Sequence, residues 1–443
     1  MIKFYNREDE LKLLNKAEKL KNKHSIMTII TGRRRIGKTT LSLKVNSDKK
    51  LYFFISKKSE KLLCNEFIEE IRSKNINIYG EFNKFDDLFS YLMEISKLTP
   101  LTLIIDEFQE FLKINPSLFS SIQKIWDLNK NTSHMHLIIS GSVYSMMKKI
   151  FEDIKEPLFG RADFKINLKP FNIQTLKDIL EDYNSYSPKN LLDFYTLTGG
   201  VAKYIDLFVL NESFTLDNMI NEIISKYSIF LDEGKNRLIE EFGKEYTTYF
   251  SILSLIASSK TSKSSIESIL QKNISGHLFR LEKDYNIIKS IKPIDAKINS
   301  KTQKYEIIDN FLNFWFRFIY KYQSFIESEN FDGLKFIINR DFSTYKGRIL
   351  EKLFIELLKN KNYSSIGSYW ERNNKNEIDI VAIDNINHKI FIAEVKLNHS
   401  RLSLNKLIQK SEKLVKKYKN YKVEYKLLSL HDIDNLIRQE ATI

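Results

Sequence analysis

A glycine-spaced motif, TGRRRIGKTTL at residues 31–41, constrains the fold more than any other stretch of this sequence. It matches the pattern G-x-x-x-x-G-K-T through Gly32, Gly37, Lys38 and Thr39. The apolar run SIMTIIT precedes the motif, and TTLSLKV opens a predicted helix behind it. Such a loop holds phosphate with backbone N–H groups and a helix N-terminus, so it needs a strand before it and a helix after it. The sequence therefore predicts an α/β fold with a P-loop NTPase core.

The side chains of this loop have distinct predicted roles toward ATP and Mg²⁺. Lys38 is expected to reach the β- and γ-phosphates, and Thr39 to offer its hydroxyl to the metal. The other residues predicted to contact the nucleotide are Gly32, Arg33, Arg34, Arg35, Ile36, Gly37 and Thr40. Three consecutive arginines are unusual here, and the sequence leaves open whether they contact phosphate or face solvent or nucleic acid.

An acidic pair, Asp106 and Glu107, ends a second apolar run in LTLIIDEF. A carboxylate at the end of a buried strand is placed to hold the Mg²⁺ shell, and the next one to polarise an attacking water. By itself this pair could be an ordinary strand end, but the glycine loop upstream favours a nucleotide site. The apolar run LYFFI lies between the two motifs. This order indicates the P-loop subclass that has an extra strand beside the P-loop strand and a catalytic glutamate.

Three further residues are candidates for the same site. Ser140 ends the run HLIISGS and could sense the γ-phosphate, or simply form a turn. Arg161, in PLFGRAD, could complete the phosphate cradle in cis or from a neighbouring subunit, or pair with an acid. Arg7, in YNRE, could contact the base.

The segment EIDIVAIDNINHKIFIAEVK reads as two strands joined by a turn, and it carries a second candidate site. Residues two apart in a strand share a face, so Glu394 and Lys396 point the same way, and the hairpin brings Asp379 beside Glu394. Glu351 lies at the edge of the apolar stripe of a preceding helix. We expect Asp379 and Glu394 to bind Mg²⁺, and all four residues to serve phosphodiester hydrolysis. The alternative is a solvated hairpin with scattered charges, which poorly explains charges embedded in an apolar strand.

Alternating strands and helices predict a parallel sheet, followed by mainly helical segments. We expect a P-loop ATPase core over 1–170, a helical lid over 171–240, a winged helix-turn-helix with a linker helix over 241–325, and a nuclease-like α/β domain over 326–443. The helix and hairpin order of the third segment is what predicts the winged helix.

Charge and composition limit the partners and the setting. The net charge of +14 favours an anionic partner such as DNA, although a general richness in Lys, Asn and Ile explains it equally well. The single cysteine, Cys64, excludes an internal disulfide and fits a reducing cytosol. No signal peptide or apolar span is expected, so we predict a cytoplasmic protein with no membrane contact.

Several segments together resemble a known family. FYNREDELKLL, GRRRIGKTTL, IIDEFQEF, IISGS, PLFGRA and TGGVAKY are similar to the archaea-rich prokaryotic P-loop ATPases related to the AAA+ and STAND classes. YEIIDNFLNFWFRFIY, GRILEKL, EIDIVA and IAEVK are similar to the C-terminal domain of that family, which resembles PD-(D/E)xK nucleases. The resemblance implies ATP with Mg²⁺, and nuclease-type residues at Glu351, Asp379, Glu394 and Lys396. Ala202 departs from the family, which tends to have proline there, and this bears on the stiffness of the lid.

Two functional hypotheses follow from the sequence. In the first, ATP-driven switching, with a homo-oligomer formed through the ATPase core, controls a Mg²⁺-dependent nuclease-like domain acting on DNA in defence or mobile-element maintenance. In the second, the chain is a nucleotide-dependent regulatory or signalling ATPase whose C-terminal domain binds DNA or a protein without cleaving.

Overall fold

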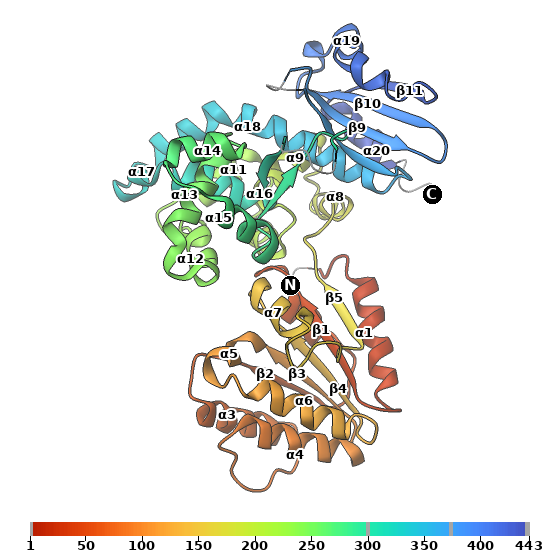
Figure 1. Ribbon diagram of the computed structural model, residues 1–443. Helices are drawn as coiled ribbons and strands as arrows, with labels where there is room; N and C mark the ends of the chain where they lie inside the picture. The colour runs from red at the N-terminus through yellow and green to blue at the C-terminus, as the bar shows by residue number, and fades with distance from the viewer. Residues whose placement is uncertain (1–2, 298–301, 372–374, 439–443) are drawn as a thin grey trace. The chain divides into compact units, whose positions relative to one another are not determined.

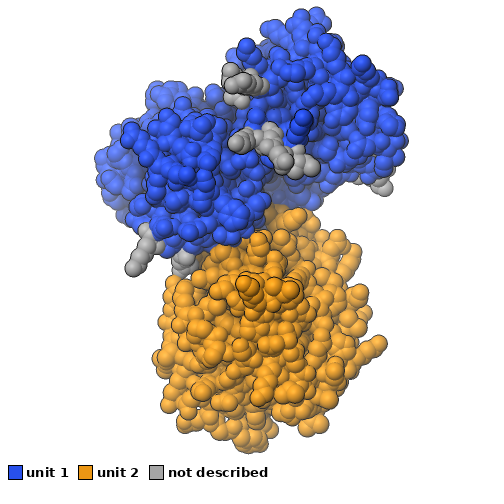
Figure 2. Space-filling model, viewed as in Figure 1, with its two compact units in different colours: residues 1–2, 171–443 blue, residues 3–170 orange. Residues whose placement is uncertain are grey.

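The computed structural model describes residues 3–297, 302–371 and 375–438. The chain divides into two compact units, one spanning Lys3–Pro170 and the other continuing from Phe171, shown in orange and blue in Figure 2. Among the described residues, no helix is long and apolar enough to cross a membrane.

The first unit is built on a five-stranded parallel sheet with the order β2-β3-β4-β1-β5. Its strands are β1 (Ile26–Thr31), β2 (Lys50–Phe54), β3 (Leu101–Asp106), β4 (Met135–Ser140) and β5 (Phe164–Asn167). β4 lies between the P-loop strand β1 and the acidic strand β3, as Figure 1 shows. The predicted extra strand beside β1 is therefore confirmed, and β4 and β5 are shorter than the runs that predicted them.

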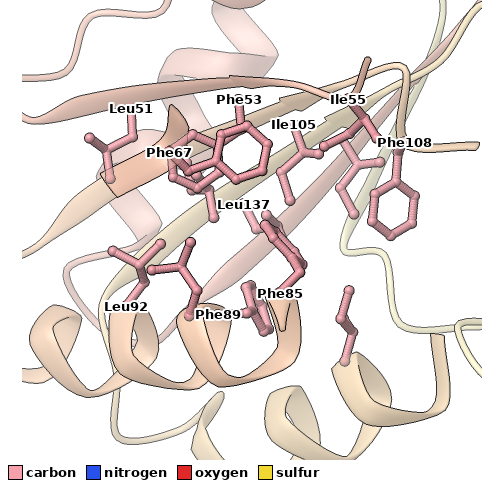
Figure 3. Close-up of a cluster of buried hydrophobic side chains, with 14 of the residues drawn as sticks. Leu51, Phe53, Ile55, Phe67, Phe85, Phe89, Leu92, Ile105, Phe108 and Leu137 are labelled. Carbon is pink, nitrogen blue, oxygen red and sulfur yellow. The ribbon is translucent and has the colours of Figure 1, made fainter. Parts of the chain in front are cut away.

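Helices cover the sheet, because the strands β1, β3 and β4 are apolar on both faces and must be buried on both. They are α1 (Glu8–Leu20), α2 (Lys38–Leu43), α3 (Glu60–Ser73), α4 (Phe85–Leu98), α5 (Phe111–Ile114), α6 (Leu118–Asn129) and α7 (Tyr144–Glu152). Figure 3 shows the aromatic centre of one layer, where Phe53 of β2 stacks on Phe67 of α3 at 4.2 Å between ring centroids. Truncating Phe53 to alanine would cost roughly 3–5 kcal/mol of stability.

The second unit begins with helices α8 (Ile173–Asp182), α9 (Pro188–Thr198), α10 (Ala202–Leu210), α11 (Leu216–Ile223) and α12 (Phe230–Phe242). The break between α9 and α10 falls at Gly199 and Gly200, which both have positive φ. A Cβ on Gly200 would lie 2.3 Å from the carbonyl oxygen of Phe171, which pairs with it through the backbone. Glycine is therefore required where α9 ends.

Three helices and a hairpin follow, in the order that the sequence predicted for this segment. They are α13 (Tyr246–Ala257), α14 (Lys263–Leu270), α15 (Ser275–Phe279) with a π-helical turn over Arg280–Asp284, and the antiparallel strands β6 (Ile288–Ile291) and β7 (Lys304–Ile307). The predicted aromatic helix comprises α16 (Asn310–Phe314) and a buried π-helical segment, Trp315–Tyr320, and α17 (Gln323–Glu327) comes next.

The C-terminal part is a mixed four-stranded sheet with the order β11-β10-β9-β8. Its elements are α18 (Phe331–Lys359), β8 (Ser365–Tyr369), β9 (Ile378–Asp384), β10 (Lys389–Val395), α19 (Leu404–Val415), β11 (Lys422–Leu428) and α20 (Ile433–Arg438). β9 runs antiparallel to β8 and β10, and β10 runs parallel to β11.

Two sequence expectations for this part were wrong. From its sequence the lysine-rich segment NKLIQKSEKLVKKYKNYK, residues 405–422, reads as one helix, but the helix ends at Val415 and Lys422 begins β11. β11 was missed, although Lys422, Glu424 and Lys426 alternate with apolar residues as in a strand with one exposed face. α18 is also much longer than the apolar stripe beginning at Gly347 indicated, since its first half carries many polar residues.

Candidate functional sites

The glycine loop has the backbone geometry that close wrapping around phosphate requires. Gly37 has φ 93°, in the left-handed region, directly before α2. Gly32 has φ 149°, and a Cβ there would lie 2.6 Å from the carbonyl oxygen of Leu168. Both positions therefore need glycine. Arg35 also has positive φ, at 71°, so the loop bends where no glycine stands.

Lys38 is buried and lies across this loop. Its Nζ donates to the carbonyl oxygens of Gly32 at 3.1 Å and Arg33 at 3.0 Å. An ammonium in this position carries positive charge directly beneath the loop, where a bound phosphate would exchange with the carbonyls. Of the other loop residues, Ile36 is buried in the core, whereas Arg34 and Thr40 are exposed.

Asp106 is the centre of a hydrogen-bond network at the carboxyl edge of the sheet. Its Oδ2 accepts from the hydroxyl of Thr39 at 2.6 Å and that of Tyr52 at 3.1 Å. Its Oδ1 accepts from the hydroxyl of Ser140 at 2.6 Å and the backbone N–H of Glu107 at 3.0 Å. All four donors are neutral groups. The hydroxyl of Thr39 and the carboxylate of Asp106 are hard oxygen donors in contact, which fits Mg²⁺.

Tyr52 was missed by sequence reasoning. It contacts Asp106 because β2 pairs with β3, with Phe54 opposite Asp106. That pairing depends on strand order, and the only signal in the sequence was a hydroxyl within an otherwise apolar run. Burial and the negative charge of Asp106 raise the pKa of Tyr52, so the phenol stays a neutral donor.

Glu107 follows Asp106 with a left-handed backbone, φ 57°. Its Oε2 accepts from the hydroxyl of Ser142 at 2.7 Å and from Nε2 of Gln109 at 2.5 Å. The candidate for activating water is therefore held by the loop that follows β4, next to the network around Asp106.

Arg161 pairs with an acid, one of the three roles that the sequence left open, and it lies near the start of β1 rather than at the P-loop end of that strand. Its guanidinium pairs with both carboxylate oxygens of Asp127, its NH2 donating at 2.8 Å. The backbone N–H of Met27, at the start of β1, donates to Asp163 just after Arg161. The P-loop lies at the other end of β1, roughly 15 Å away at the rise of a strand.

Arg7, by contrast, lies at the same edge as the P-loop. Its NH2 donates to the carbonyl oxygen of Lys169 at 2.8 Å, just beyond the end of β5 that pairs with Thr31. Burial lowers the pKa of Arg7, an effect that Glu10 partly offsets.

The second candidate site lies on the neighbouring strands β9 and β10. Ile380 pairs with Ala393, so the next residues outward, Asp379 and Glu394, stand opposite each other. Lys396 Nζ contacts Asp379 Oδ2 at 3.1 Å and Glu394 Oε1 at 3.3 Å. The three predicted side chains therefore meet on one side of the sheet.

A second lysine, Lys410 of α19, also contacts this pair and was missed. Its Nζ lies 2.9 and 3.1 Å from the two carboxylate oxygens of Glu394. α19 packs on this face of the sheet through Leu407 and Leu414. The lysine-rich pattern of this segment predicts a helix but does not indicate which lysine would face the strands.

Burial and mutual repulsion shift the ionisation of this site. Burial, followed by the negative charge of Asp379, raises the pKa of Glu351 to about 8. Burial also raises the pKa of Asp379. Burial would lower the pKa of Lys396, but the charges of Asp379 and Glu394 outweigh it and raise that pKa.

Within the described ranges, no three acidic, histidine or cysteine groups come close enough to form a metal cluster. Two carboxylates with water still suit Mg²⁺, which often takes only one or two protein carboxylates.

The first site defines a class of protein. Its features are those of a P-loop ATPase. They are a glycine loop between a buried strand and a helix, a strand-end carboxylate hydrogen-bonded to the threonine of that helix, and a parallel sheet with an inserted strand.

Comparison with known proteins agrees with this class. A family described as an ATPase domain predominantly from Archaea matches residues 4–208, and a family described as archaeal and bacterial proteins of unknown function matches residues 315–412. Uncharacterized protein MJECL04 of Methanocaldococcus jannaschii is 30% identical over 413 residues, which cover 89% of this chain and 87% of that protein. The chain belongs to this predominantly archaeal ATPase family.

A solved structure shares the fold. The Walker-type ATPase PABY2304 of Pyrococcus abyssi is 20% identical, with a TM-score of 0.55 over 71% of this chain and 96% of that one. The ORC2 protein of Aeropyrum pernix, in ADPNP and ADP complexes, is 14% identical over 74% of this chain and 95% of that one, with a TM-score of 0.47.

Proposed function

We propose that this protein binds and hydrolyses ATP with Mg²⁺, and that ATP-driven switching controls a metal-dependent, nuclease-like C-terminal domain that acts on DNA. The proposal of a nuclease-like C-terminal domain rests on the convergence of Asp379, Glu394 and Lys396 on one side of the sheet. The division of the second unit into a lid, a winged helix and a nuclease-like domain is part of this proposal.

The ATPase half rests on the residues around Asp106. Lys38 supplies positive charge beneath the loop, and Thr39 with Asp106 supplies oxygen donors for Mg²⁺. Mg²⁺ would offset the charge of the phosphates when bound. Glu107 lies at the end of the same strand, where release from Ser142 would leave it able to orient water.

The nuclease half rests on the kinds of groups that meet on β9 and β10. Two carboxylates suit a divalent ion, and a lysine between them can orient water or offset the negative charge that develops on phosphate. Glu351, with its raised pKa, would remain protonated near neutral pH and could exchange a proton in this site. Lysines along α19 and the net charge of +14 favour DNA as the partner.

A regulatory or signalling ATPase is the second candidate. The observation that favours it is the pairing of Glu394 with both Lys396 and Lys410, because ion pairs that persist would keep Glu394 from holding a metal. In that case the C-terminal domain would bind DNA or a protein without cutting. Assembly through the ATPase core, with Arg161 reaching a neighbouring subunit, belongs to both candidates.

Plasmid nicking in Mg²⁺ or Mn²⁺, with and without ATP, separates the two candidates. We expect nicking by the wild type and its loss in Asp379→Ala and Lys396→Ala. Glu424→Ala is the matched control, because Glu424 lies exposed on β11 of the same sheet. Wild-type nicking equal to that of Asp379→Ala under every nucleotide condition would favour the regulatory candidate.

A further inference from the structure

The β6–β7 hairpin contacts the residues that flank both ends of the C-terminal carboxylate site. We propose that this hairpin is a positioning element of that site rather than a wing that reads DNA. The inference deepens the proposed function and rests on it for the identity of the site. It reassigns a hairpin that the sequence placed in a separate winged-helix module.

The first contact is a continuation of the sheet edge. Just after β6, the backbone N–H of Ile294 donates to the carbonyl oxygen of Ser368 in β8 at 2.9 Å. The side chain of Ile294 packs on the apolar cluster formed by β8, β9, β10 and α19. Ser368 in turn donates its hydroxyl to the carbonyl oxygen of Asp379 at 2.8 Å. One residue therefore joins the hairpin to the backbone of a candidate catalytic carboxylate.

The second contact comes from β7. Lys304 Nζ lies 2.8 Å from Oε1 of Glu377, two residues before Asp379, and 4.4 Å from the ring centroid of Trp370. Trp370 is buried, so this lysine combines an ion pair with a cation–π contact at the end of β8. Asp295 also forms an ion pair with Lys417, beyond the end of α19.

The third contact reaches the helix that carries Glu351. The neighbouring residue, Lys352, donates to the carbonyl oxygen of Ile307 at 3.1 Å and lies 3.7 Å from Glu306, both in β7. The hairpin thus contacts Lys352, next to Glu351, and Glu377, two residues before Asp379. It also contacts β8, which lies between these two positions in the sequence. Lys289 and Lys304 of the hairpin pair with protein carboxylates, where a DNA-reading wing would offer its lysines to phosphate.

The experiment uses full-length protein and two variants that remove matched charges from one hairpin. Lys304→Ala breaks the contact with Glu377, whereas Lys289→Ala removes a lysine that pairs with Glu306 on the adjacent strand. The measurements are backbone-amide hydrogen exchange over β8 and β9, metal-dependent nicking, and DNA affinity in EDTA. We expect Lys304→Ala to speed exchange at least fivefold and slow nicking about tenfold, with DNA affinity unchanged and Lys289→Ala near wild type.

The outcomes separate the inference from the proposed function. Faster exchange in Lys304→Ala without nicking by the wild type would support the positioning role and reject the nuclease. Unchanged exchange and nicking in Lys304→Ala would overturn the inference. A loss of DNA affinity with unchanged cleavage of bound DNA would also overturn it, in favour of a DNA-reading wing.

Discussion

The carboxylates of the two sites are held by different kinds of donors. Asp106 accepts from three hydroxyls and one backbone N–H, all of them neutral. Asp379 and Glu394 instead lie against the ammonium groups of Lys396 and Lys410. A cation approaching Asp106 has to displace a hydroxyl, whereas a cation approaching Glu394 must compete with charges of its own sign.

The two kinds of donor have different consequences for the metal affinity of a carboxylate. Neutral donors orient a carboxylate and leave its charge for the metal. Lysines also orient a carboxylate, but they neutralise its negative charge. The metal affinity of such a carboxylate therefore depends on salt concentration and on the positions of the lysine side chains. We therefore expect strong, nucleotide-linked Mg²⁺ binding in the first unit and weaker, salt-sensitive binding in the second.

The largest expected effect is at Lys38. Lys38→Ala should lower ATP hydrolysis by at least about 100-fold, because it removes the positive charge beneath the phosphate loop. The measurement is phosphate release, with Lys44→Ala as a control at the exposed end of the same short helix. Hydrolysis by Lys38→Ala at the wild-type rate would remove the ATPase claim.

Lys410→Met tests whether the ammonium of Lys410 competes with a metal ion for Glu394. Losing one ammonium beside Glu394 should tighten Mn²⁺ binding in the second unit about tenfold at low salt, with less change at high salt. Isothermal titration measures this, and Lys413→Met is the control because that lysine on the same helix pairs with Glu371 instead. Equal affinities for the two variants would mean that Lys410 does not compete with the metal.

The neutral network is tested by Tyr52→Phe, which removes one donor from Asp106. A hydrogen bond to a charged group is worth roughly 1.5–3 kcal/mol, and the three donors that remain offset part of its loss. We therefore expect a net loss of about 1 kcal/mol, so the Mg²⁺ concentration for half-maximal hydrolysis should rise roughly fivefold. ATP binding without Mg²⁺ should stay the same. Tyr91→Phe, whose hydroxyl faces the carbonyl oxygen of Asn77, should match the wild type. An unchanged Mg²⁺ requirement would limit Tyr52 to packing.

Glu351 predicts a pH dependence of stability. Its pKa is raised to about 8 in the folded protein, so between the ordinary glutamate pKa and pH 8 the folded state binds more protons than the unfolded one. Stability from this group therefore falls as pH rises through that window, and the loss is complete above it. Glu351→Gln should unfold at a higher temperature than the wild type at pH 9, by about 2–4 °C, and near the wild type at pH 5.

A matched variant on the same helix controls that comparison. Glu356 pairs with Lys359 and is more exposed, so Glu356→Gln should show no such gain at pH 9. Equal pH profiles for wild type and Glu351→Gln would show that Glu351 does not carry the proton.

The smallest effect is expected at Arg161. Arg161→Ala breaks a partly exposed pair with Asp127, which should cost about 0–1 kcal/mol of stability and leave hydrolysis by the monomer unchanged. Because the proposed assembly brings this arginine to a neighbouring subunit's site, the fall in hydrolysis should grow with protein concentration, and hydrolysis equal to that of the wild type at every concentration would contradict that role.

The parts of the molecule that sequence predicted well are those set by local pattern. β1, β3 and the loop at Gly32 follow from apolar runs and glycine spacing, and the opposition of Asp379 and Glu394 follows from strand alternation and a short turn. Tyr52 could not be found, because its role depends on which strand lies next to β3.

The contacts of Lys410 and of the β6–β7 hairpin with the C-terminal sheet could not be found for a related reason. One lysine among many on α19 meets Glu394 only because the helix packs on that face of the sheet. Three roles stayed open for Arg161, because sequence does not tell at which end of a strand a loop arginine will pair. These are all consequences of tertiary packing, which local pattern does not encode.

Mn²⁺ binding in the presence of a non-hydrolysable ATP analogue is the sharpest test of the proposal that the chain holds two distinct metal sites, because it needs no activity from either site. We expect two classes of bound Mn²⁺ in the wild type, with Thr39→Val removing only the nucleotide-linked class and Asp379→Asn only the salt-sensitive one. A titration in which Asp379→Asn binds Mn²⁺ as the wild type does would contradict the account of the second site.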